Sequence, residues 1–166
     1  NPSGKLPYTY QKHAATPMPY IHTVTDRADN FGGYTDYDPQ WPFGFGLSYT
    51  SFRYDTVYVD SKYIRGNDSL KVSVQITNTG KMKGKEVVQL YLRDDFASVD
   101  PDYERLIRFK KIELEPGESK IVEFTVYEKD LAFVSQNNTW TVEAGSFTLT
   151  SGDRLHVKKE VKIEYI

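Results

Sequence analysis

The sequence predicts an all-β protein built around an antiparallel β-sandwich of about seven strands. From residue 52 onward, apolar and polar residues alternate with the period of two that is typical of a half-buried strand. Turn residues interrupt this alternation at intervals of roughly 8–12 residues, and the sequence has no long helical pattern. Aromatic residues make up 14% of the chain, a share that suits the faces of β-sheets.

Six strands after residue 50 are predicted from alternate apolar positions. Leu70, Val72, Val74 and Ile76 illustrate the pattern, because the residues between them are polar. The fifth strand is expected to bend at Gly145, where the missing side chain permits a sharp change of direction. In order, the six strands cover residues 52–59, 70–76, 88–92, 122–126, 140–149 and 157–163.

Two turn signals separate strands in this part of the chain. Asn78-Thr79-Gly80 is the first, and Glu115–Glu118 is the second. In the second, Pro116 fits the first central position of a type II turn and Gly117 fits the next position, where φ is positive.

The core is expected to depend on apolar packing alone. The sequence contains no cysteine, which excludes disulfides, thiolate metal sites and cysteine nucleophiles. Trp140 is the predicted centre of the core, because burying an apolar side chain of large size contributes roughly 1.5–3 kcal/mol before entropy is counted.

The first 50 residues differ in composition from the rest and are rich in Pro, Gly, Tyr, Asp and Thr. Only Lys5–Tyr10 is predicted to be a strand, and residues 11–47 are predicted to be mostly coil. Since a coil of this length is unusual inside a compact domain, we expect it to cover a surface that another part of the protein supplies. The chain begins at Asn1 with neither an initiator Met nor a signal peptide, which predicts a piece of a longer protein.

Several segments, taken in order, resemble the C-terminal region of family 3 glycoside hydrolases. Asn1–Pro7 resembles the motif that enters the last strand of the family's second domain. Trp41–Thr50 resembles the segment that leads into the family's fibronectin III-like domain. The resemblance continues inside that domain at Asn78–Gly80, Gly84–Tyr91, Leu114–Ser119 and Glu143–Phe147.

This resemblance implies a fold and a division into domains. Residues 1–50 would be the tail of a preceding α/β domain, with an N-terminal strand and a long coil segment, plus an interdomain joint. Residues 51–166 would be an immunoglobulin/fibronectin III-like sandwich. The joint is expected to be stiff and anchored by aromatic rings, because Pro fixes φ and Gly permits turns that a Cβ would forbid; its residues are Pro42, Phe43, Gly44, Gly46 and Tyr49.

The resemblance also implies an activity for the whole protein, that of a retaining β-glycosidase acting on terminal β-glucosides or β-xylosides. Such an enzyme uses two carboxylates about 5–5.5 Å apart. The family's nucleophile is an Asp in a Ser-Asp-Trp-like context, but this sequence has no Asp-Trp dipeptide. The family's acid/base Glu belongs to the second domain, upstream of the motif at Asn1. The chain alone is therefore expected to be non-catalytic.

Its expected partners are then the upstream catalytic domains of the same polypeptide, which it would brace, and family resemblance favours a periplasmic or secreted bacterial protein. The net charge of −2 argues against a nucleic-acid partner, because phosphate binding requires concentrated Lys and Arg. No apolar run approaches the ~20 residues that a membrane helix requires.

Other chemistry is sparsely represented. Close carboxylate pairs lie among turn residues, where Asp usually accepts hydrogen bonds from backbone amides, so structural roles are favoured for Asp36/Asp38, Asp94/Asp95 and Asp100/Asp102. Calcium binding by residues 94–102 is an open alternative, although the ligand spacing is not a recognised one. The histidines at 13, 22 and 156 lack metal-ligand spacing, and no metal or other cofactor is predicted.

A rival hypothesis is a carbohydrate- or surface-binding module. Tyr34, Tyr37 and Trp41 are the candidate substrate-binding residues, because exposed rings stack on the sugars of an oligosaccharide. Packing of these rings between domains is the favoured reading, since Pro and Gly residues flank them. A spacer or adhesion domain is a third possibility, but it would need no long lead-in rich in Tyr, Gly and Pro.

Overall fold

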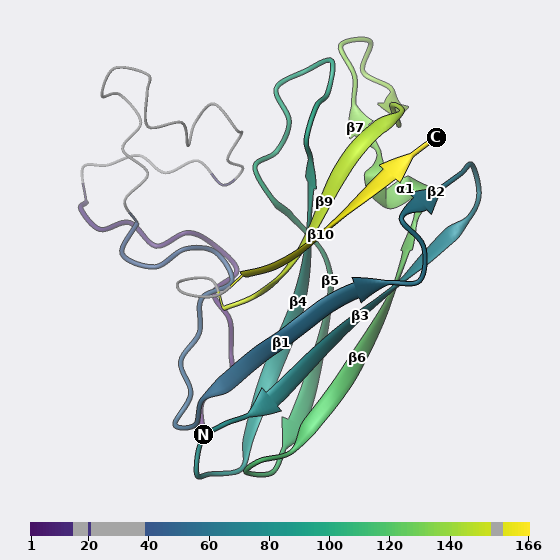
Figure 1. The fold of residues 1–166 in the computed structure, drawn as a ribbon. Coiled ribbons are helices and arrows are strands. Elements are labelled where there is room, and N and C mark those ends of the chain that lie inside the picture. Colours follow the sequence, from purple (N-terminus) through teal and green to yellow (C-terminus); the bar gives the residue numbers. More distant parts are fainter. Residues whose placement is uncertain (15–19, 21–38, 154–157) are drawn as a thin grey trace.

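The computed structural model describes residues 1–14, 20, 39–153 and 158–166. Within them, two sheets face each other as a sandwich (Figure 1). The three-stranded sheet has the order β1-β3-β6, with strands Phe52–Val59, Ser69–Asn78 and Ser119–Tyr127. The five-stranded sheet has the order β2-β10-β9-β4-β5, with strands Tyr63–Ile64, Lys158–Tyr165, Gly145–Gly152, Gly84–Asp94 and Arg105–Leu114. Neighbouring strands are antiparallel, apart from the short β2, which runs parallel to β10.

The predicted fold class is confirmed. Among the described residues, seven strands are eight or more residues long, and the sheets pack as an all-β sandwich. The predicted turn at Glu115–Glu118 also forms, because the Glu118 amide donates to the Glu115 carbonyl at 3.0 Å. Gly117 has the positive φ expected there, at 77°.

Apolar side chains from both sheets form one core. Alternate residues of β3 and β4 point into it, and Phe147 is its largest fully buried side chain. Branched aliphatic residues fill the remaining space, including Leu70, Val72 and Leu90. Their close packing stabilises the sandwich without a disulfide.

The prediction that Trp140 is the centre of the core is wrong, because its side chain is 72% exposed. The predicted strand 140–149 is two separate strands, β8 (Trp140–Thr141) and β9, with β9 starting at Gly145. β8 pairs with β7 (Phe133–Val134) in a small hairpin outside the main sheets, after the one-turn helix α1 (Glu128–Leu131). Smaller side chains from the long strands fill the core, and Trp140 lies outside it.

The expected strand at Lys5–Tyr10 is replaced by looser pairing. The Tyr10 amide donates to the Trp41 carbonyl at 2.8 Å, and this bridge is isolated. Further along, the Leu6 amide donates to the Phe45 carbonyl, also at 2.8 Å. Pro7 has no amide hydrogen to donate, so a regular ladder cannot continue through this segment.

Candidate functional site

The joint segment, Trp41–Thr50, runs antiparallel to the first ten residues and lies beside the start of β1. The Gly44 amide donates to the Leu6 carbonyl at 2.8 Å. Asn1 accepts hydrogen bonds at its Oδ1 from the Tyr49 amide at 2.8 Å and from the Ser48 hydroxyl at 3.1 Å. These contacts connect residues almost 50 positions apart, so the joint segment and the N-terminal segment form one unit.

Aromatic rings follow the joint segment. The Trp41 and Phe45 rings are stacked, with centroids 6.1 Å apart and planes inclined by 2°. Tyr10 adds a third ring, whose centroid lies 5.2 Å from that of Trp41. Phe43 meets Tyr91 edge-on at 6.3 Å, which links the joint segment to β4. Such ring pairs favour a single arrangement of the segment.

The two glycines of the joint segment serve different purposes. Gly44 has φ = 82°, a conformation that a side chain disfavours. Gly46 instead permits a close approach, because a Cβ there would lie against the Gly4 carbonyl oxygen at a distance that real Cβ atoms essentially never show. Pro42 is buried beside them, whereas the Tyr49 side chain is 72% exposed.

A buried polar group fastens this unit to the sandwich. Lys5 Nζ lies 2.7 Å from Glu86 Oε1, and the two side chains are only 17% and 7% exposed. The Tyr54 hydroxyl donates to the same Glu86 oxygen at 3.0 Å. Burial, followed by the Glu86 charge, raises the pKa of Tyr54 well above its usual value, so the hydroxyl keeps its proton.

Sequence reasoning missed this group. Lys5 and Glu86 lie far apart in the sequence, and no local motif connects them. One signal was present: Glu86 stands in phase with Val88 and Leu90, the inward positions of β4. A carboxylate at an inward position implies a buried partner, because an unpaired charge is costly in a core.

Of the three predicted substrate-binding residues, the structure describes Trp41. Tyr34 and Tyr37 lie outside the described residues. Trp41 is 37% exposed, and its ring is engaged by Tyr10 and Phe45. Its free surface is therefore limited by its own neighbours.

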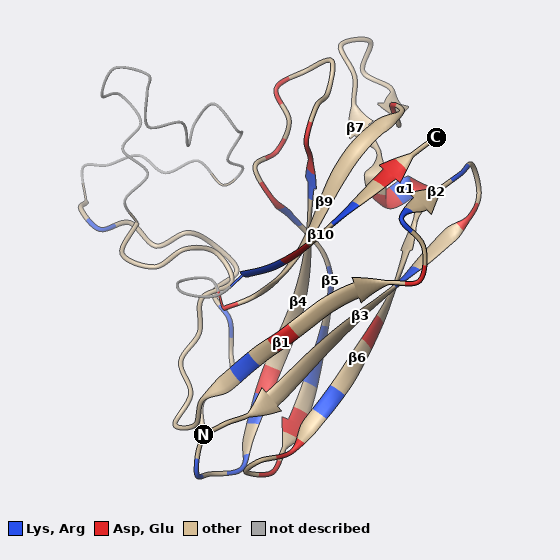
Figure 2. Ribbon diagram, in the orientation of Figure 1, with Lys and Arg blue, Asp and Glu red and all other residues tan. Residues whose placement is uncertain are grey.

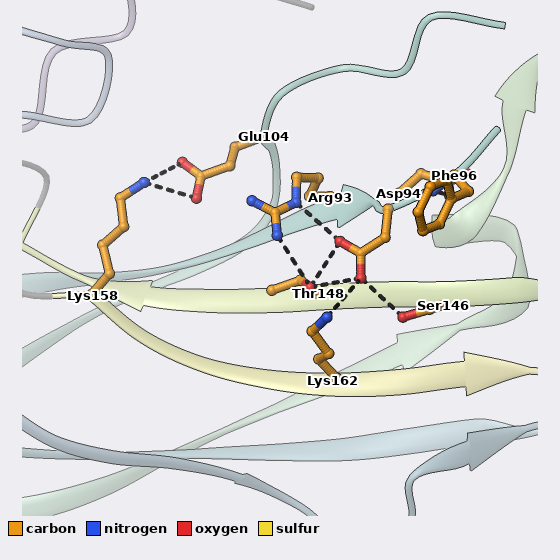
Figure 3. Close-up of polar contacts among 9 residues, drawn as sticks. Arg93, Asp94, Phe96, Glu104, Ser146, Thr148, Lys158 and Lys162 are labelled. Carbon is orange, nitrogen blue, oxygen red and sulfur yellow. Dashed lines mark hydrogen bonds and ion pairs between the residues drawn. The ribbon is translucent and has the colours of Figure 1, made fainter. Parts of the chain in front are cut away.

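Polar contacts cluster at the end of β4 and connect neighbouring strands (Figure 3). Asp95 accepts hydrogen bonds from Arg93, Ser146 and Thr148 at 2.9–3.0 Å, and Lys162 lies 3.7 Å away. Burial alone would raise the pKa of Asp95, but these donors outweigh burial and hold the pKa below its usual value. Asp95 therefore acts as a structural anion between β4 and β9.

Its neighbour Asp94 has the opposite character. Its Oδ1 accepts the Phe96 amide at 3.1 Å, and its Oδ2 is buried without a hydrogen-bond partner among the described residues. Burial raises the pKa of Asp94 from 3.8 to about 6, and the charges of Glu143 and Asp95 add to the rise.

This rise predicts a pH-dependent effect of replacing Asp94 with Asn. A group whose pKa is raised by folding contributes stability that is fully present below its pKa in the unfolded chain, here about 4. This stability is lost as the pH rises through its pKa in the folded chain, here about 6. The shift corresponds to about 3 kcal/mol at most, and screening at this partly exposed position reduces it to about 1–2 kcal/mol. The variant should therefore gain that amount relative to the original chain between pH 4 and pH 7.5, measured by urea unfolding. Equal differences at both pH values would contradict the assignment.

The remaining candidates are the three histidines and the carboxylate pairs Asp36/Asp38 and Asp100/Asp102, of which Asp36 and Asp38 lie outside the described residues. His13 is exposed, and the other two histidines lie outside the described residues. Across residues 1–14, 20, 39–153 and 158–166, no group of three or more His, Asp or Glu residues is arranged to hold a metal ion. In the same part of the chain, no helix is long and apolar enough to cross a membrane.

Charges of both signs are interspersed on the strands (Figure 2). Lys83, for example, pairs with Glu115 at 2.8 Å and with Glu113 at 3.2 Å. Exposed pairs of this kind contribute little to stability. Two basic residues near the β3–β4 turn, Lys83 and Lys85, thus pair with nearby carboxylates.

Comparison with known proteins places this geometry in context. Residues 86–154 match the fibronectin type III-like domain. A β-xylosidase of Formosa agariphila is 42% identical over 155 residues, and the thermostable β-glucosidase B of Acetivibrio thermocellus is 40% identical over 164 residues. The alignments cover 92% of this chain in both cases, but only 21% and 22% of those proteins. A periplasmic β-glucosidase of Salmonella typhimurium is 36% identical over 170 residues, covering 96% of this chain and 22% of that protein.

Solved structures agree with these relatives. A β-glucosidase from Erythrobacter marinus matches 99% of this chain with a TM-score of 0.88 and 36% identity, and the match covers 22% of that enzyme. The chain therefore spans about a fifth of the length of the proteins that it resembles.

Proposed function

Since the chain belongs to the C-terminal region of the family 3 glycoside hydrolases, with their fibronectin type III-like domain, we propose that it braces a retaining β-glycosidase. The whole enzyme hydrolyses terminal β-glucosides or β-xylosides, and this region contributes no catalytic residue. Both substrate classes are proposed because the relatives include a β-xylosidase and a β-glucosidase. Substrate choice would then be decided in the upstream domains.

The observation that carries the bracing role is the buried contact between Lys5 and Glu86, with Tyr54 beside it. It fastens the N-terminal segment to β4 of the sandwich. Residues 1–50 would be the tail of the preceding α/β domain together with the joint, and residues 51–166 would be the sandwich. A domain whose tail is held in this way keeps a fixed position on its neighbour.

Two further parts of the proposal concern the partners of this region and the location of the enzyme. The upstream catalytic domains of the same polypeptide are the partners of this region, and the oligosaccharide substrate meets those domains. The enzyme acts in the periplasm or outside the cell, a placement supported by the periplasmic relative of Salmonella typhimurium.

The test uses the parent enzyme and a matched pair of glycine substitutions. Gly46→Ala places a Cβ against the Gly4 carbonyl and the Lys5 side chain, whereas Gly4→Ala meets no atom within 4 Å. At elevated temperature, the parent enzyme loses its activity on aryl β-glycosides with a measurable half-life. We expect Gly46→Ala to shorten this half-life of activity at least fivefold and Gly4→Ala to leave it unchanged. The isolated chain should hydrolyse neither aryl β-glucoside nor aryl β-xyloside. Equal half-lives for the two variants would contradict the bracing role, and turnover by the isolated chain would contradict its non-catalytic character.

A further inference from the structure

A hollow of about 410 Å³ lies beside Asp94, at the end of β4. It opens between the loop of residues 95–104 and the β7–β8 hairpin. Lys5 contacts Glu86 near the start of β4, and Phe43 of the joint segment contacts Tyr91, whereas the hollow is lined by Leu92 and Asp94 at the end of that strand. Because successive side chains of a strand point to opposite faces, Tyr91 and Leu92 lie on different faces of the sheet, and none of the described residues of the joint segment lines the hollow. The volume falls within the range of roughly 300–1,000 Å³ that small-ligand sites occupy.

Trp140 forms one wall of this hollow, and hydrogen bonds hold the backbone of its hairpin in place. Its strand pairs with Val134, and the hairpin turn is closed by a hydrogen bond from the Ser135 amide to the Thr139 carbonyl at 2.9 Å. At the base of the hairpin, Arg105 donates to the Ala132 carbonyl at 2.9 Å and to the Asp130 carbonyl at 2.5 Å. An indole that is 72% exposed on such a hairpin offers a flat apolar face, and its ordered backbone lowers the ordering cost of binding.

The polar lining decides which ligand suits this face. Three carboxylates line the hollow, at Asp94, Asp100 and Asp102, against the single guanidinium of Arg105. Arg105 already donates to two carbonyl groups, so the lining disfavours an anion. The rest of the surface is mostly apolar, with Leu92, Leu131 and Phe133 among its residues.

From this arrangement we propose that the hollow binds a neutral sugar ring. The C–H face of a pyranose would stack on Trp140, and ring hydroxyls would donate to the carboxylate of Asp102. Sugars combine one apolar face with many hydroxyl donors, which matches an indole bordered by acceptors. The site lies on the sandwich itself, so the inference does not depend on where the upstream domains place their substrate.

The test titrates the 166-residue chain with cello- and xylo-oligosaccharides, followed by tryptophan fluorescence and calorimetry. The sequence contains two tryptophans, and Trp41→Phe leaves Trp140 as the sole reporter. We expect a saturable fluorescence change in Trp41→Phe with an affinity within twofold of the original chain. Trp140→Ala should weaken binding at least tenfold, Trp140→Phe should restore part of that loss, and Asp102→Asn should weaken binding about threefold.

Other outcomes overturn the proposal. Binding that is lost in Trp41→Phe and kept in Trp140→Ala would assign the sugar to the joint segment instead. A flat titration with sugars would show that the hollow binds no sugar. Binding of tetralysine in place of sugars would assign the acidic hollow to a cationic peptide. The urea midpoint of Trp140→Ala should match that of the original chain, because the indole lies outside the core; if it does not, Trp140→Phe and Asp102→Asn decide the result. None of these outcomes affects the half-life measurement that tests the bracing role.

Discussion

Replacing Asn78 with alanine is expected to lower the free energy of unfolding by about 3–5 kcal/mol, because its fully buried side chain makes four hydrogen bonds. Its Nδ2 donates to the Met82 carbonyl at 2.8 Å and to the Leu114 carbonyl at 3.1 Å. Its Oδ1 accepts the Thr50 hydroxyl at 2.8 Å and the Gly80 amide at 3.1 Å. Asn78 thus joins the end of the joint segment, the β3–β4 turn and the end of β5. Alanine would leave these polar groups without their partner, and each such buried group costs about 1–3 kcal/mol.

Urea unfolding at pH 7 checks this expectation, with Thr79→Ala as the matched control. Thr79 is the next residue and is exposed, and its hydroxyl makes one hydrogen bond, to the Ser51 carbonyl at 3.3 Å. The control should change the free energy of unfolding by less than about 0.5 kcal/mol. A loss below about 1 kcal/mol for Asn78→Ala would show that neighbouring groups or water replace its contacts.

Much of the sandwich could be predicted because a strand that is buried on one face has alternating apolar and polar residues. β3 and β4 follow this pattern clearly, since alternate residues such as Val72 and Leu90 enter the core. The turn at Glu115–Glu118 could also be predicted, because its second central position requires a positive φ and Gly117 stands there. Local sequence therefore specified strands such as β3 and β4 and one turn, and these are found in the structure.

β5 was not predicted, for a physical reason. It lies at the edge of the five-stranded sheet, so one flank has no strand beside it. Only Leu114 among its ten residues is fully buried, whereas Phe109 is exposed. An edge strand with this composition carries charged residues in place of an apolar alternation. Its identity follows from pairing with β4, a long-range contact that no local window contains.

The error at Trp140 has a related cause. Large apolar side chains are usually buried, but that rule depends on where the chain turns after each strand. Here the chain leaves the core between Leu131 and Gly145 to form the β7–β8 hairpin. The sequence of a two-residue strand is too short to reveal such an excursion. The same excursion creates the hollow, so the misplaced residue became the main feature of a candidate site.

Replacing Lys5 with methionine is the second change with a large expected effect, about 3 kcal/mol of lost stability. The substitution removes the cation from Glu86, whose side chain is 7% exposed, and leaves it only the hydrogen bond from Tyr54. An uncompensated buried charge of this kind typically costs about 3–5 kcal/mol. The matched control is Lys85→Met on the same strand as Glu86, because Lys85 pairs with Glu113 at 3.8 Å on the exposed surface. The control should cost less than about 1 kcal/mol.

A double variant separates loss of the charge pair from loss of packing. In Lys5→Met/Glu86→Gln, the amide oxygen still accepts the Tyr54 hydroxyl, but no charge is buried. We expect this chain to regain about 2 kcal/mol relative to Lys5→Met alone, because the penalty comes from the unpaired carboxylate. Adding salt should change the Lys85→Met difference more than the Lys5→Met difference, since buried pairs are screened less. If Lys5→Met and Lys85→Met destabilise equally, the contact with Glu86 is an ordinary surface pair, and the N-terminal segment is held to the sandwich by the contacts of Asn1 and the aromatic stack instead.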